Sequence, residues 1–146
     1  MLNLPDFQHE ILSQATPILS KRHAYTRVDQ TRPDWNQAKV NAMRYVLRAK
    51  FGNTQGELLD LLRGTRDAPI VEISHRDQFW GARPIGDRIE GQNVLGRLLM
   101  ELRLDLCEHR SGDPVLIEPR FPDPQLCGRV LGAEEVMPEA TPSLLI

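Results

Sequence analysis

The stretch DWNQAKVNAMRYVLRAKF, residues 34–51, carries the strongest structural signal in the chain. Asp34 followed by Gln37 matches a capping box, in which the carboxylate accepts a backbone N–H and the amide reaches back. Beyond this start, apolar residues recur at steps of three and four, and a second apolar stripe adjoins the first. The stripes are Trp35, Ala38, Ala42, Tyr45, Val46 and Ala49, and Val40, Met43, Leu47 and Phe51. This spacing predicts a helix that is buried over a wide arc, at the centre of the fold.

Two shorter helices are predicted on either side of this stretch. Residues 7–20 have a helical apolar spacing, and Pro17 should kink or end that helix near its last turn. Thr54 with Glu57 repeats the capping box and opens a short leucine-rich helix, for which Gly64 is a left-handed stop.

The second half of the chain alternates between short regular elements and a long loop. Residues 69–73 read as a short strand, and a polar loop follows over residues 74–92. Asn93 then caps a helix with leucines along one side, and Gly112 ends it. Residues 115–118 are expected to form one more strand. Five prolines between residues 119 and 142 make further regular structure unfavourable, so we expect a tail that wraps the surface or is disordered.

Composition narrows the class of protein. The chain has 146 residues and a formal charge of -2, a near balance that argues against a purely electrostatic binder of nucleic acid or membrane. Most of its basic residues are arginines, which suit phosphates and carboxylates, although an arginine-rich genome gives the same bias. Cys107 and Cys127 show no metal-ligand spacing, and no apolar run nears the ~20 residues that span a bilayer. We expect a cytoplasmic protein with no bound metal or cofactor and no membrane partner.

The polar loop holds the candidate site. Loops of this length inside a compact domain are usually functional. Glu72 and Asp77 could share the acid–base or oxocarbenium-stabilising work that glycosyl transfer needs, and Trp80 beside Gly81 could present its ring to a base or sugar. The helix that begins at Asn93 offers N–H donors suited to a phosphate.

Each of these residues also has an ordinary structural interpretation. Trp80 could be a core or lid anchor. Asp77 could cap a turn or pair with Arg76 or Arg83. Glu72 lies on the apolar strand, where a buried carboxylate would have to be paired.

Four blocks of sequence carry a family resemblance through their order and spacing. They are residues 34–35 with the helix end at 43–51, residues 58–62 followed by 71–72, residues 76–81, and residues 91–103. Together they resemble a NADAR (YbiA-like) N-glycosidase domain over about residues 5–108. The resemblance implies a helix-dominated α+β fold for residues 1–110, and residues 111–146 are left as a proline-rich extension.

The resemblance also implies an activity and roles for residues. Members of this family hydrolyse N-glycosidic bonds, either in phosphoribosylated pyrimidine intermediates of riboflavin synthesis or between ADP-ribose and guanine. The motif positions place Asp77 and Glu72 at the catalytic centre and Trp80, Gly81 and Asn93 in substrate binding, with the amides of residues 91–93 near the phosphate. From the loop itself we add the substrate-binding candidates Gln92 and Arg83.

One part of the family pattern is not in the sequence. The resemblance implies a preceding Ser-Glu-His-aromatic-Phe-Gln-Ala-x-Lys-Phe segment, which supplies an acid and a lysine implicated in catalysis. We therefore expect an N-glycosidase that gains this segment from an upstream reading frame, a different start codon or a partner chain. The alternatives are a catalytically inactive module that binds ADP-ribose or a ribose phosphate, and an interaction subunit of an assembly. The expected partners are a nucleotide-like small molecule and, for the ADP-ribose branch, ADP-ribosylated nucleic acid.

Overall fold

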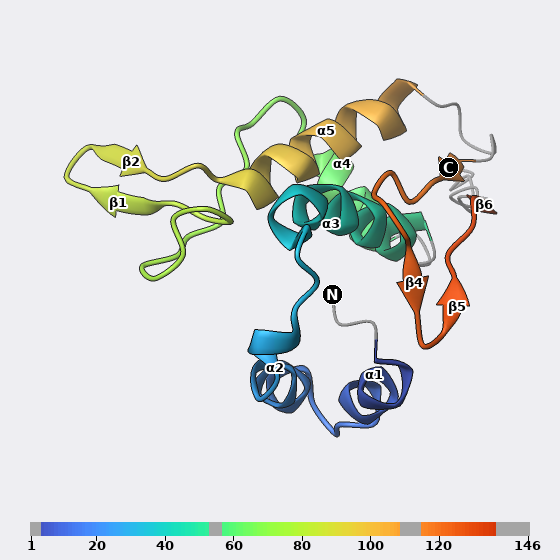
Figure 1. The fold of residues 1–146 in the computed structure, drawn as a ribbon. Helices are drawn as coiled ribbons and strands as arrows, with labels where there is room; N and C mark the ends of the chain where they lie inside the picture. The colour runs from blue at the N-terminus through green and yellow to red at the C-terminus, as the bar shows by residue number, and fades with distance from the viewer. Residues whose placement is uncertain (1–3, 53–56, 109–114, 137–146) are drawn as a thin grey trace. The chain divides into compact units, whose positions relative to one another are not determined.

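The computed structural model describes residues 4–52, 57–108 and 115–136, and it has the expected helix-dominated α+β architecture. The chain divides into two compact units, residues 1–43 with 118–133, and residues 44–117 with 134–146. The division falls within the long helix α3 (Trp35–Gly52), so each unit takes one half of it (Figure 1). In the described part of the chain, no helix is long and apolar enough to cross a membrane.

The first unit begins with two helices where the sequence predicted one. α1 spans Pro5–Leu12 and α2 spans Pro17–Tyr25, followed by the 3-10 helix η1 at Val28–Gln30. The prediction that Pro17 ends or kinks a helix was wrong, because Pro17 is the first residue of α2. A proline at this position loses no hydrogen bond, since the first N–H groups of a helix have no partner within it. The Thr16 hydroxyl completes the start by accepting a hydrogen bond from the Leu19 N–H at 3.3 Å.

Part of the proline-rich tail is built into this first unit. β4 (Gln125–Leu126) and β5 (Arg129–Val130) form a short antiparallel hairpin, where the prolines had predicted no regular structure. Buried Gln8 accepts a hydrogen bond from the Cys127 N–H through its Oε1. Phe7 is 3% exposed, and the Arg27 guanidinium lies 4.6 Å from the centre of its ring. The tail therefore helps to form the unit that α1 begins.

Arg32 joins the start of α3 to the same tail. Its guanidinium donates to the Asp34 carboxylate at 2.5 and 2.8 Å, and to the carbonyls of Pro122 at 2.6 Å and Asp123 at 3.2 Å. The hydrogen bond from Arg32 lowers the pKa of Asp34 below its ordinary value. The predicted capping carboxylate is thus held by an arginine.

This pair should make the protein sensitive to acid. A carboxyl group with a lowered pKa stabilises the folded state above its unfolded pKa, near 4, and that contribution is lost as the pH falls through the folded pKa. We expect Arg32→Ala to lower the thermal midpoint at pH 7 and to reduce the loss of stability between pH 5 and about pH 2. Thermal unfolding across this range, with exposed Arg129→Ala as control, checks the prediction. An unchanged acid dependence in Arg32→Ala would contradict it.

The second unit packs helices around a leucine core. It contains α4 (Glu57–Gly64) and α5 (Val94–Glu108), which contact each other, and the antiparallel pair β3 (Val115–Ile117) and β6 (Glu134–Val136). β3 confirms the strand predicted at residues 115–118. The buried apolar residues are Leu47, Phe51, Leu59, Leu62, Ala82, Val94, Leu98, Leu102 and Ile117.

A ladder of ion pairs connects α3 to α5. Arg44 donates to both carboxylate oxygens of Glu101, at 2.6 and 3.1 Å, and Arg48 donates to Asp105 one turn further on. A paired fork of this kind is stronger and more directional than a single contact. The two pairs set the register of the helices. The matching four-residue steps from 44 to 48 and from 101 to 105 are the sequence signal from which these pairs could have been predicted.

Several local predictions differ from the structure. Residues 69–73 make only an isolated parallel bridge, between Ile73 and Ala82. Gly64 lacks the left-handed conformation expected of it, which occurs at Arg66 with φ 48°. The predicted signals at Thr54 and Gly112 lie outside the described residues.

Candidate functional site

The side chain of Asn93 joins the end of the candidate loop to its beginning through two hydrogen bonds. Its Nδ2 donates to the Ile70 carbonyl at 2.8 Å, and its Oδ1 accepts from the Glu72 N–H at 3.0 Å. Its backbone is left-handed, with φ 48°, and its carbonyl accepts from the Arg97 N–H at 3.0 Å. Asn93 thus lies at the predicted start of α5. Its side chain, however, clamps residues 70–72 instead of capping the helix.

Three glycines allow the backbone to cross itself beside this clamp. A Cβ at Gly81 would lie 2.6 Å from the Glu72 carbonyl oxygen, and a Cβ at Gly91 would lie 2.6 Å from the Gly81 carbonyl oxygen. A Cβ at Gly96 would overlap the Ile70 carbonyl and lie 2.5 Å from the Asn93 amide nitrogen. Gly91 also has φ 143°, a conformation that side chains disfavour. These close approaches fix the path of the loop.

The backbone N–H groups at the start of α5 donate hydrogen bonds to carbonyl groups of the loop. The N–H of Gln92 donates to Gln78, that of Asn93 to Gly81, that of Val94 to Phe79 and that of Leu95 to Trp80, at 2.7 to 3.1 Å. The family resemblance predicts that the amides of residues 91–93 face a phosphate. In this structure the residue 92 and 93 amides instead satisfy carbonyls of residues 78–81, so an anion here would have to displace them.

Asp77 organises the turn that carries Trp80. Its Oδ1 accepts hydrogen bonds from the N–H groups of Phe79 at 3.0 Å and Trp80 at 2.9 Å. Its own N–H donates to the Ser74 hydroxyl at 3.0 Å. Among the described residues Oδ2 has no hydrogen-bond donor, and the residue is exposed. Asp77 therefore performs the turn-capping role considered from the sequence and still presents one carboxylate oxygen.

Trp80 and Glu72 flank this turn. Trp80 is half-buried and makes an edge-to-face contact with Phe79 at a centroid distance of 5.1 Å. Glu72 is exposed, so the interpretation of it as a buried carboxylate that must be paired does not apply. The backbone of Glu72 is held between Asn93 and the Ala82 N–H, which donates to its carbonyl at 2.8 Å. Hydrogen bonds and close contacts around Gly81 thus gather the main chains of Glu72, Asp77, Trp80 and Asn93.

The rest of the loop forms a β-hairpin that was not predicted from the sequence. β1 (Arg83–Ile85) pairs with β2 (Arg88–Glu90), and Gly86 with φ 56° opens the two-residue connection, as hairpins with glycine first prefer (Figure 1). The sequence Ile85-Gly86-Asp87-Arg88 was the available signal. The hairpin carries Arg83, while Gln92 follows it in an exposed position.

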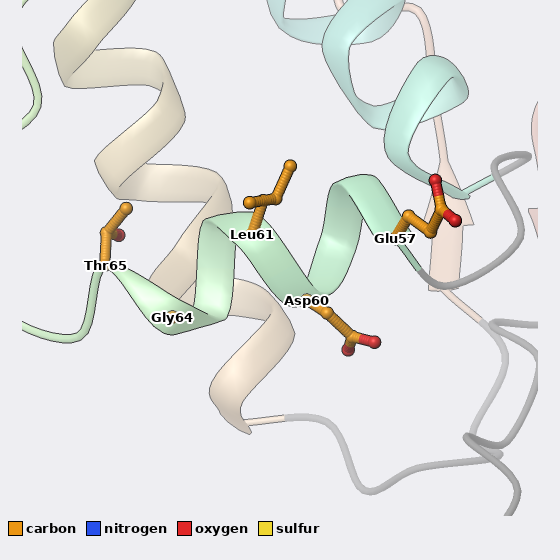
Figure 2. A pocket seen from close by; sticks show the side chains of 5 residues that line it. All are labelled: Glu57, Asp60, Leu61, Gly64 and Thr65. Carbon is orange, nitrogen blue, oxygen red and sulfur yellow. The ribbon is translucent and has the colours of Figure 1, made fainter.

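A shallow groove lies elsewhere in this unit, along α4. Figure 2 shows its lining, formed by Glu57, Asp60, Leu61, Gly64 and Thr65, and it includes none of the predicted site residues. Leu61 is 70% exposed there. Within the described ranges, no group of three histidine, cysteine or acidic side chains could hold a metal ion.

The helices and the loop closed by hydrogen bonds around Gly81 define an α+β domain, and comparison with known proteins identifies its family. The family model described as the NADAR domain matches residues 1–107, so the chain belongs to the NADAR family. It is 38% identical over 100 residues to the N-glycosidase YbiA of Escherichia coli (strain K12), a match covering 68% of this chain and 60% of that relative. It is 35% identical over 105 residues to the chloroplastic riboflavin biosynthesis protein PYRR of Zea mays, which covers 69% of this chain and 16% of that protein.

A third relative is a riboflavin biosynthesis protein of Vibrio vulnificus, 43% identical over 79 residues, or 53% of this chain and 20% of that protein. The chain therefore spans about 60% of the length of the YbiA relatives and a smaller share of the riboflavin proteins. No solved structure gives a significant match.

Proposed function

We propose that this protein hydrolyses the N-glycosidic bond of a ribosylated, nucleotide-like substrate. Membership of the NADAR family and similarity to proteins named N-glycosidase support a glycosidase-type activity. The observation that carries the proposal is the turn at residues 77–80, where hydrogen bonds from its main chain hold Asp77 next to Trp80 in an exposed loop. A carboxylate beside an aromatic ring suits a ribose attached to a flat base.

The reaction assigns a separate task to each side chain. Water attacks the anomeric carbon as its bond to the base nitrogen breaks, and a proton passes to the departing base. The Oδ2 of Asp77 stabilises positive charge on the ribose in the transition state, and Glu72 is the candidate acid or base. Trp80 stacks on the base or sugar beside Gly81, and Arg83 and Gln92 contact the substrate. Asn93 acts as a positioning residue, because its amide holds the main chain of Glu72.

The substrate proposal has two branches. One is a phosphoribosylated intermediate of riboflavin synthesis, supported by the names of the riboflavin relatives. The other is ADP-ribose attached to guanine in nucleic acid, which rests on the family resemblance alone. The Ser-Glu-His to Lys-Phe segment implied by that resemblance is not among these 146 residues. We expect turnover to depend on it, whether it is joined to this chain or supplied by a partner chain.

A hydrolysis assay tests this proposal. Purified chain is incubated with each class of substrate, alone and with the family segment, and free base and ribose phosphate or ADP-ribose are measured by chromatography. We expect release only with the segment present, and a fall of ~10-fold or more in Trp80→Ala, since base–aromatic stacking contributes ~1–3 kcal/mol. Equal activity of the chain alone would contradict the dependence on the segment. Ligand binding without release under either condition would favour the inactive binding module.

A further inference from the structure

One arginine in the candidate loop has a buried donor without a partner. Among the residues that the structure describes, the Nε of Arg83 is a buried side-chain nitrogen with no hydrogen-bond acceptor. Buried polar groups are nearly always paired, because an unpaired donor loses its contact with water and gains nothing in return. Arg83 is the first residue of β1 and only three positions beyond Trp80. Its Nε therefore marks a place where an acceptor is needed beside the candidate site.

The hairpin places a second arginine on the same face. Arg83 lies opposite Glu90, and Ile85 lies opposite Arg88, so these four residues share one face while Pro84 and Ile89 share the other. Within the described part of the chain, neither arginine of this face forms an ion pair. Glu90 faces Arg83 in the register without joining it in a salt bridge. Two guanidinium groups thus remain available to an anion.

The main-chain donors nearby cannot serve such an anion as they stand. The amides of Gln92, Asn93, Val94 and Leu95 already donate to carbonyls of residues 78–81. A phosphate near Trp80 would therefore need side-chain donors. Arginine suits it best, because its planar fork offers two parallel hydrogen bonds to an oxyanion.

We infer that Arg83, assisted by Arg88, binds the phosphate or diphosphate group of the substrate. This inference rests on the proposed function for the identity of the substrate and adds which residues hold its phosphate or diphosphate group. A rotamer change that opens the Nε edge of Arg83 lets one phosphate oxygen accept from Nε and another from the adjacent Nη. Arg88 contributes from the opposite strand, and Ile85 lies between the two on the shared face. Glu90 is the internal competitor for Arg83.

Binding of inorganic pyrophosphate, followed by calorimetry on the full chain, tests the inference without requiring turnover. We expect Arg83→Gln to raise the Kd by about tenfold, as loss of a charge-assisted hydrogen bond does, and Arg88→Gln by about threefold. Arg83→Lys should recover part of the affinity, because it keeps the charge but loses the fork. Arg129→Gln, an exposed arginine of the hairpin in the other unit, should bind as the parent does. Thermal unfolding should show all four variants folded, because neither Arg83 nor Arg88 makes a side-chain hydrogen bond among the described residues.

The outcomes separate this inference from the proposed function. Pyrophosphate binding that depends on Arg83, without hydrolysis of any ribosylated substrate, would support the anion site while removing the proposed function. Hydrolysis at the parent rate in Arg83→Gln, with substrate below KM, would overturn the anion site while the proposed function stands. If Arg83→Gln weakened the binding of adenosine and of pyrophosphate equally, that result would also overturn the anion site, because adenosine has no phosphate for these arginines to hold.

Discussion

Replacing Gly96 with alanine is expected to lower the free energy of unfolding by about 3 kcal/mol, the upper end for overpacking in a well-packed site. The added Cβ would overlap the Ile70 carbonyl and lie 2.5 Å from Nδ2 and 2.6 Å from Oδ1 of Asn93. A backbone carbonyl cannot yield as a flexible side chain does. The Asn93 clamp on residues 70–72 must therefore open. The gain of helix propensity from glycine to alanine, ~1 kcal/mol, is smaller than this cost.

Gly64 is the matched control for this substitution. It is also helical, being the last residue of α4, but a Cβ there would meet nothing within 4 Å. We expect Gly64→Ala to be neutral or to stabilise the protein by up to ~1 kcal/mol. Urea unfolding of both variants measures the difference. If the two alanines have the same effect, the clamp is not the constraint that the geometry indicates.

Asp77→Asn is expected to reduce turnover at least ~100-fold while leaving the fold intact, because losing one group that stabilises charge in the transition state costs ~10²–10³-fold in rate. The asparagine side-chain oxygen can still accept from the N–H groups of Phe79 and Trp80 and so keeps the turn. It cannot supply the negative charge that the ribose needs in the transition state. Asp77→Ala should lose turnover and also ~1 kcal/mol of stability, since the turn loses its acceptor.

The assay uses the chain together with the family segment, and thermal unfolding reports stability in parallel. Asp87→Asn removes another exposed carboxylate from the same loop and should leave both readouts unchanged. If Asp77→Asn kept the turnover of the parent, the role of Asp77 would be limited to capping the turn. That result would contradict the assignment of a catalytic role.

Local patterns predicted the main helices well. The apolar spacing of residues 34–51 corresponds to α3 at Trp35–Gly52, and the leucine spacing after Asn93 corresponds to α5, which begins at Val94. Ala38, Ala42 and Leu47 are buried as their positions predicted, whereas Val46 is 51% exposed. Helical burial follows from residues three and four apart, so a short window of sequence contains most of the information needed.

The site was only partly predictable because its contacts join distant residues. Asn93 was expected to cap a helix and bind substrate, yet its amide binds residues more than twenty positions earlier. Gly64 was expected to be left-handed from its place at a helix end, but Arg66 adopts that conformation and Gly64 does not. The hairpin at residues 125–130 forms although the prolines of this segment predicted no regular structure. Hydrogen bonds from the tail to Gln8 and from Arg32 to the tail hold its main chain in place.

The sequence by itself determined the helices, the family and the residues that gather in one loop, because hydrophobic spacing and motif order are local properties. Only the tertiary structure decided what those residues do for one another. It showed that Asn93 and the glycines tie the loop, that the α5 amides are occupied by carbonyls of residues 78–81, and that Arg83 has a buried donor to satisfy. The physical reason is that hydrogen-bonding groups are satisfied by whichever partner the fold brings close, and sequence spacing does not record that partner.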